Sequence, residues 1–141
     1  MKSLRIVITM CLLFTASAMF AQTEIQRLMT VNIPFEFSVE DHYLPAGQYV
    51  VFTVTPERSI RIASADGKPS AIVNTVPNYA EAPSTNSRLV FRRYGDDYFL
   101  AQVWTAGQNV ARNPLSSRRA MQVASRGSVF QTIAITAFAS H

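Results

Sequence analysis

The sequence predicts an all-β protein, a small antiparallel β-sandwich or barrel of about seven strands with one short helix near the C-terminus. Three observations predict this class. Apolar and polar residues alternate with a period of two over several stretches, which is typical of half-buried strands. Turn-forming residues separate these stretches at short intervals. Only the segment after Gly107 carries signals for the start and stop of a helix.

The first expected strand covers residues 29–39, where every odd position is apolar and every even position is polar or proline. This period predicts that Phe37 and the other odd-numbered side chains face the core. Pro34 lacks a backbone donor, so we expect it at a sheet edge or a bulge. A polar turn at residues 40–42 precedes a second strand over residues 48–55.

Residues 58–63 and 71–76 are predicted to form a hairpin around an Asp-Gly turn at residues 66–67. Its inward positions are Ile60 and Ile62, with Arg61 outward. Residues 77–87 are rich in turn formers and have no apolar period, which predicts a surface loop.

A second hairpin is predicted for residues 88–94 and 98–105, which flank Gly95-Asp96. A two-residue loop places Arg93 opposite Tyr98 and Tyr94 opposite Asp97. The expected core face contains Leu89, Phe91, Tyr98 and Leu100. The expected outer face contains Arg88, Val90, Arg92, Phe99, Ala101 and Val103.

The helix is predicted over residues 114–126, with Asn113 as its cap, Pro114 in its first turn and Gly127 at its end. Its apolar stripe is thin, so we expect it to pack only lightly on the sheet. Residues 129–139 are rich in β-branched and aromatic side chains and predict a final strand.

Residues 1–21 are typical of a cleavable export signal, with a basic start, an uncharged apolar run and small residues before Gln22. The run is shorter than the about 20 apolar residues that span a bilayer, and the alternatives are a buried N-terminal helix or a membrane anchor. Cys11, the only cysteine, lies in this run. The processed chain is therefore expected to be a cysteine-free protein of the periplasm or the extracellular space, with no stable membrane span.

Residues 22–141 suit one β-rich domain, ordered from about residue 28. Without Lys2 and Arg5 the chain keeps eleven basic and nine acidic side chains, a formal charge of +2. Such a small charge does not indicate a nucleic-acid partner.

Three segments resemble a group of small exported bacterial β-domain proteins. Their sequences are Val-Asn-Ile-Pro-Phe-Glu-Phe-Ser-Val at 31–39, Leu-Pro-Ala-Gly-Gln-Tyr at 44–49 and Arg-Tyr-Gly-Asp-Asp-Tyr-Phe-Leu-Ala-Gln-Val-Trp at 93–104. The resemblance covers most of residues 29–127, and residues 129–141 are less typical of the group. It implies an exported single domain and supplies no activity, ligand or catalytic residue.

Candidate chemistry is sparse. His42 is the only histidine inside the domain, and no serine lies in a nucleophile-elbow pattern. The acidic pairs at 40–41 and 96–97 lack the spacing of a calcium loop, and turn geometry explains them better than calcium binding or glycoside hydrolysis. No phosphate loop, zinc motif or dinucleotide fingerprint is present, so we expect no cofactor, metal or catalytic residue.

Two surfaces are candidates for binding. Aromatic side chains gather at Tyr94, Tyr98 and Trp104, with Phe99 between them, and exposed rings of this kind stack on sugars or peptides. Arginines gather at Arg112, Arg118, Arg119 and Arg126. Guanidinium groups bind carboxylates and phosphates through paired hydrogen bonds, so these arginines predict contact with an anionic envelope component or another protein.

These features favour a non-enzymatic binding or interaction module of the cell envelope. The first alternative is a hydrolase that acts on an envelope or extracellular substrate through a site without a sequence motif. The second is a small outer-membrane barrel, although Arg61, Arg88, Arg92 and Arg93 would interrupt its apolar bands.

We expect exported material to begin at Gln22 and therefore to contain no thiol. Intact-mass measurement of the exported protein checks this start, and a mass that retains Cys11 would contradict it. Since no disulfide can form after cleavage, the thermal unfolding midpoint of the processed protein should not change with reductant.

Overall fold

The structure, a computed structural model, describes residues 25–55 and 58–139. The predicted export signal, Cys11 and His141 lie outside the described residues. The strands are β1 Gln26–Ile33, β2 Phe37–Val39, β3 His42–Leu44, β4 Gly47–Thr55, β5 Ser59–Ser64, β6 Ser70–Tyr79, β7 Arg88–Tyr94, β8 Asp97–Trp104, β9 Val110–Pro114, β10 Gln131–Thr136 and β11 Phe138–Ala139. The helix is α2 (Arg118–Ser125). The described part of the chain is thus mostly β with one short helix near the C-terminus, as predicted.

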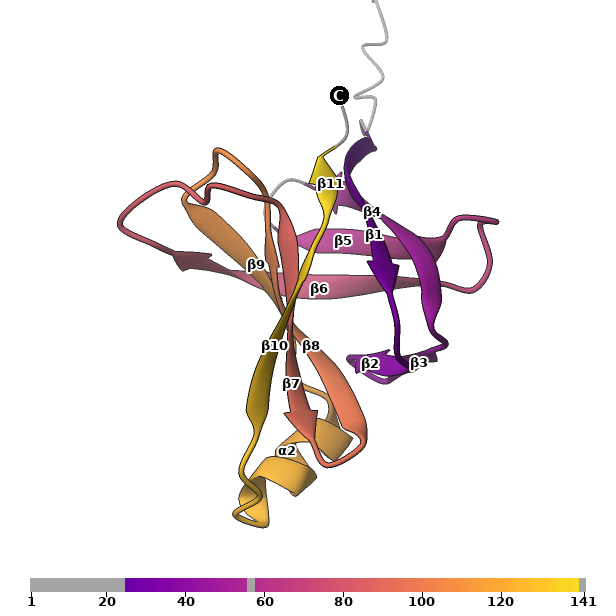
Figure 1. Cartoon of the computed structure of the whole chain (residues 1–141), viewed down its shortest axis with the longest axis vertical. Coiled ribbons are helices and arrows are strands. Elements are labelled where there is room, and N and C mark those ends of the chain that lie inside the picture. The colour runs from indigo at the N-terminus through magenta and orange to yellow at the C-terminus, as the bar shows by residue number, and fades with distance from the viewer. Residues whose placement is uncertain (1–24, 56–57, 140–141) are drawn as a thin grey trace, which may run out of the picture.

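The strands form one hydrogen-bonded path in the order β10-β7-β8-β9-β6-β5-β4-β1-β11, with β2 and β3 beside β8. In Figure 1, β5 and β6 lie across the view while β7, β8 and β10 run along its long axis. β6 belongs to both halves, because residues 70–74 pair with β5 and residues 75–79 pair with β9. The two ends of the path are consecutive in the chain, since only Ala137 separates β10 from β11.

The prediction of about seven strands was wrong, because the described residues contain eleven. The additional strands are short. The expected strand over 29–39 is divided into β1 and β2, and Pro34 lies in the interruption between them. β3 begins inside the expected turn at 40–42, and β9 includes residues that were expected to open the helix.

The inward faces of both halves form the core, and the predicted facing of residues 29–39 is confirmed. All odd-numbered side chains in this stretch are buried except Phe35, which is half-buried and packs against the core. In β5 the predicted facing is also confirmed, because Ile60 and Ile62 are fully buried whereas Arg61 is not.

The predicted start of the hairpin β7–β8 is confirmed, with Arg93 opposite Tyr98 and Tyr94 opposite Asp97. Farther along, the register shifts by one residue, so that Ala101 in β8 has no opposite residue in β7. This bulge changes the facing of the rest of β8.

Val103 shows the effect of the bulge. The alternation predicted an outward side chain, but Val103 is fully buried in the core. The prediction was wrong because one extra residue in a strand moves every later side chain to the other face. Simple alternation would also have put Gln102 on the same face as Leu100, and the same shift turns it away from the core.

The expected start of the helix at Asn113 and Pro114 was also wrong. These residues end β9 and pair with Val76 and Thr75 of β6. The helix cap is instead Ser117, whose Oγ accepts a hydrogen bond from the Ala120 amide at 3.0 Å. Sheet pairing has therefore overridden a local cap signal, and it also extends β6 into the expected loop at 77–87.

Within the described residues, no helix combines the length and the apolarity needed to cross a bilayer.

Phe37→Ala should lower the free energy of unfolding by about 3 to 5 kcal/mol. The Phe37 ring is 1% exposed and meets the rings of Tyr49 and Phe91 edge to face, with centroids 5.3 and 5.5 Å away. Ser38→Ala, the matched control on the opposite face of β2, should change stability by less than about 0.5 kcal/mol. Urea unfolding of both variants measures the difference, and equal losses would contradict this register.

Candidate functional site

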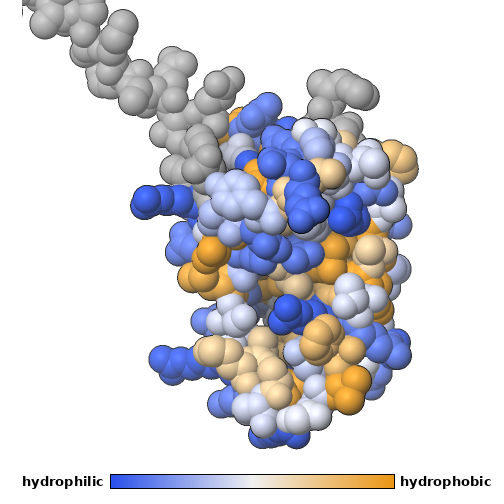
Figure 2. All heavy atoms as spheres, turned by 90° about the vertical axis from the view of Figure 1, so that its left-hand side faces the viewer, coloured by the Kyte–Doolittle hydropathy of each residue, from blue (hydrophilic) through white to orange (hydrophobic). Residues whose placement is uncertain are grey.

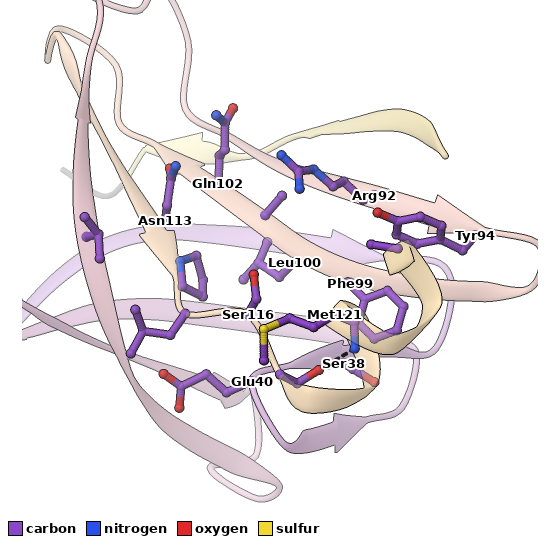
Figure 3. Close-up of a pocket in the computed structure, with 17 residues that line it drawn as sticks. Ser38, Glu40, Arg92, Tyr94, Phe99, Leu100, Gln102, Asn113, Ser116 and Met121 are labelled. Carbon is purple, nitrogen blue, oxygen red and sulfur yellow. Dashed lines mark hydrogen bonds between the residues drawn. The ribbon is translucent and has the colours of Figure 1, made fainter. Parts of the chain in front are cut away.

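A pocket of about 320 Å³ lies between α2 and the outer face of the sheet. Its walls come from β2 and the residue that follows it, β6, β7, β8, β9, α2 and the segment between β9 and α2. Figure 3 shows Met121 of α2 and Ser116 near its centre, with Arg92 and Glu40 on opposite sides. The volume is in the usual range for small-molecule or side-chain binding, about 300 to 1,000 Å³.

The pocket lies where β8 changes partner. On the edge away from β7, β8 pairs with β2 at Phe99 and with β9 at Val103 and Trp104. Between these ladders, Leu100, Ala101 and Gln102 pair with no described strand on that edge, and all three line the pocket. The pocket is therefore a gap in the sheet that α2 covers from outside.

One face of α2 is turned toward this gap. Ser117, Ala120, Met121 and Ala124 line the pocket, at the three- and four-residue spacing of one helix face. No residue of α2 is buried, and Met121 remains 54% exposed. The predicted light packing is confirmed. At this end of the molecule, the lower end in Figures 1 and 2, apolar and hydrophilic side chains are interspersed on the surface.

An ion pair joins α2 to the β7–β8 hairpin. The Arg119 guanidinium lies 2.7 Å from the Asp97 carboxylate, and both side chains are partly exposed. The neighbouring Asp96 makes only a long contact of 4.0 Å with Arg93. An exposed pair adds at most about 1 kcal/mol to stability, so it positions a lightly packed helix without fixing it rigidly.

The polar groups of the pocket differ in how they are satisfied. Glu40 Oε1 accepts a hydrogen bond from the backbone N–H of Asn74 at 3.1 Å. Asn74 is the last residue of β6 that pairs with β5, before β6 begins to pair with β9. Glu40 also has a positive φ of 49°, which is uncommon for a residue other than glycine. The Asn113 Oδ1 atom is buried and has no hydrogen-bond partner among the described residues.

The cation in the pocket wall is Arg92. Its guanidinium lies 5.1 Å from the ring centroid of Phe130, in the segment that joins α2 to β10. Phe130 in turn packs at 5.7 Å from the ring of Tyr94. This wall therefore combines one positive charge with aromatic surface.

The predicted aromatic group does not form one exposed surface. Tyr94 and Phe99 are buried and pack together at 5.9 Å in the pocket wall. Tyr98 points to the other face of β8, where its ring stacks on Phe35 with centroids 3.8 Å apart. Trp104 is buried in a separate cluster and donates a hydrogen bond to Gln102 at 3.0 Å.

The four predicted arginines are likewise divided. Arg112 lies in β9 and is buried, with a hydrogen bond of 3.4 Å to Gln108. Arg119 makes the ion pair with Asp97. Arg118 and Arg126 are exposed on α2 and at its C-cap. Arg112, Arg119 and Arg126 recur every seven residues, as on one helix face, but only Arg119 and Arg126 belong to the helix or its cap.

The remaining candidates occupy turns. Asp96 lies at the tip of the β7–β8 hairpin, and Asp41 and His42 lie at the β2–β3 turn. Beside that turn, a hydrogen bond to the Glu36 carboxylate raises the pKa of Tyr43 above its ordinary value, with a smaller contribution from desolvation. No group of three or more His, Cys, Asp or Glu side chains suited to a metal occurs in residues 25–55 and 58–139.

One useful signal was missed in the sequence. Asp97 is the last acidic residue, and the rest of the chain contains four arginines and no carboxylate side chain. Three of these arginines lie on α2 or at its C-cap. The pocket itself had no local signal, because it depends on which strands flank β8.

Comparison with protein-family models, curated proteins and solved structures finds no match to this chain.

Asp97→Asn should speed hydrogen exchange in the amides of α2 without unfolding the protein. The variant removes the ion pair to Arg119, and the expected loss of global stability is at most about 1 kcal/mol. Asp96→Asn is the matched control, since it makes the same change one residue away at a much longer ion pair. Exchange measured by mass spectrometry should separate the two, and identical α2 exchange would show that the pair does not hold the helix.

Proposed function

We propose that this protein is an exported, non-enzymatic binding module of the cell envelope, and that it binds an anionic partner in the pocket beneath α2. The export part of the proposal rests on the signal-like residues 1–21. In this proposal the two halves of the sheet form a sandwich-like scaffold, and the binding site lies on its outside.

The observation that carries the proposal is the relation of α2 to the pocket. A helix on a sheet normally buries its apolar face against the core. Here Ala120, Met121 and Ala124 face a pocket and remain unburied. A ligand in the pocket would remove this apolar surface from water, which favours binding by about 25 cal/mol for each Å² covered.

The exposed positive charges on α2, together with Arg92 in the pocket wall, favour an anionic partner. Arg92 lines the wall, and Arg118 and Arg126 are exposed on the helix and its cap. Arg119 is already engaged by Asp97, so it is not included in the proposed binding set. Arg118 and Arg126 lie outside the lining, so they would attract an anionic partner to this end of the molecule while Arg92 meets it in the pocket, and both effects weaken with salt.

The polar groups of the lining support binding rather than hydrolysis. Glu40, the carboxylate in the wall, is occupied as an acceptor for the Asn74 amide. Ser117 accepts the capping hydrogen bond from Ala120. A hydrolytic site needs a base within reach of a nucleophile, and these two groups instead stabilise the fold around the pocket.

The triple variant Arg92→Gln, Arg118→Gln, Arg126→Gln should lose salt-sensitive retention on envelope fractions while keeping its fold. Each exposed charge pair contributes up to about 1 kcal/mol, so binding should weaken roughly tenfold to a hundredfold. Co-sedimentation at low and high salt measures this loss, with circular dichroism as the check on folding.

The control carries Gln at Arg27, Arg58 and Arg61, which gives the same change of charge on or beside β1 and β5. It should be retained like the wild type. If both triple variants lose retention equally, the loss follows from the change in net charge and not from these three arginines. If the wild-type protein is not retained, the proposed function is refuted.

A further inference from the structure

We propose that the pocket beneath α2 binds a zwitterion, a short group with a carboxylate at one end, a protonated amine at the other and an apolar segment between them. Arg92 pairs with the carboxylate, and Glu40 pairs with the amine. This inference rests on the proposed function and names the group that the partner places in the pocket.

The first argument is a pair of opposite charges in the pocket wall. Glu40 and Arg92 are the only charged side chains among the described residues that line the pocket. Figure 3 shows them on opposite sides, with Ser116, Leu100 and Met121 between them. Neither charge forms an ion pair with a described residue. A ligand that carries both charges would therefore supply the partner that each of them lacks.

The second argument is that each charge is positioned by a contact that leaves part of the group available. Glu40 Oε1 accepts from the backbone N–H of Asn74 at 3.1 Å, and no described residue donates to Oε2. The Arg92 guanidinium lies 5.1 Å from the ring centroid of Phe130, and no described residue accepts from its N–H groups. Groups that are already held in place lose less conformational freedom when a ligand binds.

The third argument is the residue type at position 40. The φ of 49° at Glu40 is one that glycine and asparagine adopt at a lower cost. Turn geometry alone therefore does not explain a glutamate here. Its longer side chain brings a carboxylate to both β6 and the pocket wall.

The size and charge of the pocket disfavour other anions. A volume of about 320 Å³ is near the lower end of the usual range, about 300 to 1,000 Å³, so the ligand is short. A fatty acid would pair with Arg92 but would place its apolar tail beside Glu40. A dianion would place a second negative charge there. Both arrangements leave a carboxylate without a favourable partner, which costs free energy.

The probe is ω-aminohexanoate, and its matched control is the N-acetyl derivative, which keeps the carboxylate and the chain but has no positive charge. Three of the five methionines precede Gln22, so the processed protein contains only Met29 and Met121. Met29 is fully buried in the core, whereas Met121 lines the pocket. With isotope-labelled methionine methyl groups, NMR titration follows binding at Met121, and Met29 serves as the internal reference.

We expect ω-aminohexanoate to shift the signal of Met121 and not that of Met29. It should bind at least about tenfold more tightly than its N-acetyl derivative, which corresponds to about 1.4 kcal/mol. Arg92→Gln should weaken the binding of both compounds, because both carry the carboxylate. Arg93→Gln, the matched control outside the lining, should leave both affinities unchanged.

Glu40→Gln should remove the preference for the amine. This variant keeps an oxygen that can accept from the Asn74 N–H but loses the charge. Its affinity for the N-acetyl compound should stay at the wild-type value, which also shows that the pocket is intact. Asp41→Asn removes a charge one residue away and outside the lining, and it should keep the wild-type preference.

Competition distinguishes a zwitterion that belongs to the envelope from one that is a free solute. Excess ω-aminohexanoate should release the wild-type protein from the envelope fraction, because the probe and the envelope partner occupy one pocket. Binding without release would place the envelope partner elsewhere and refute the proposed function, while the zwitterion site stands.

Equal affinity of the wild-type protein for the two compounds, or no shift of the Met121 signal, would overturn the inference. The proposed function would stand in that case as long as retention depends on the three arginines. If retention is also independent of them, the inference and the proposed function are both refuted.

Discussion

Two strands, β6 and β8, each pair with different neighbouring strands along their length, and the backbone pairing at these two places determines the form of this molecule. β6 changes its partner from β5 to β9 after Asn74, and the backbone groups of Asn74 have other partners. Its backbone N–H donates to Glu40, and its backbone carbonyl accepts a hydrogen bond from the Leu115 N–H at 3.2 Å. β8 passes from β9 to β2, and on the edge away from β7 residues 100–102 pair with no described strand. Because buried backbone groups require partners, the first change holds the two halves of the sheet together, whereas the second leaves a gap that the pocket occupies.

The bulge at Ala101 links the core to this edge. Its extra residue turns Val103 into the core while Phe99 and Gln102 stay on the outer face, so one strand serves the interior and the pocket wall together. Bulges commonly end or redirect pairing next to functional sites. Here the bulge lies between the two ladders of β8, where it interrupts pairing and lines the pocket at once.

The helix α2 packs weakly on the sheet but is positioned by two specific polar contacts. α2 buries no side chain, and its position depends on the Ser117 cap and on the ion pair from Arg119 to Asp97. Segments with few buried contacts open at a low free-energy cost, which is compatible with the proposed binding beneath α2. The stable aromatic core around Phe37 and the lightly held helix therefore have different tasks in one small fold.

Neighbouring residues alone were enough to predict the alternation over 29–39, the inward facing of Ile60 and Ile62, and the Gly95-Asp96 turn with its pairing of Arg93 and Tyr98. Their period and turn geometry are local, so no distant contact was needed to predict them. The tertiary structure decided that Asn113 and Pro114 extend a strand, that Arg112 is buried and that Val103 faces inward. The burial of Arg112 and the extension of β9 depend on β6, which lies far away in the chain and supplies hydrogen bonds that override local preference. The facing of Val103 depends on a bulge inside the β7–β8 hairpin, which the alternation of residue types does not indicate. The pocket beside β8 also depends on tertiary structure, since the gap between β2 and β9 exists only once both strands pair with β8.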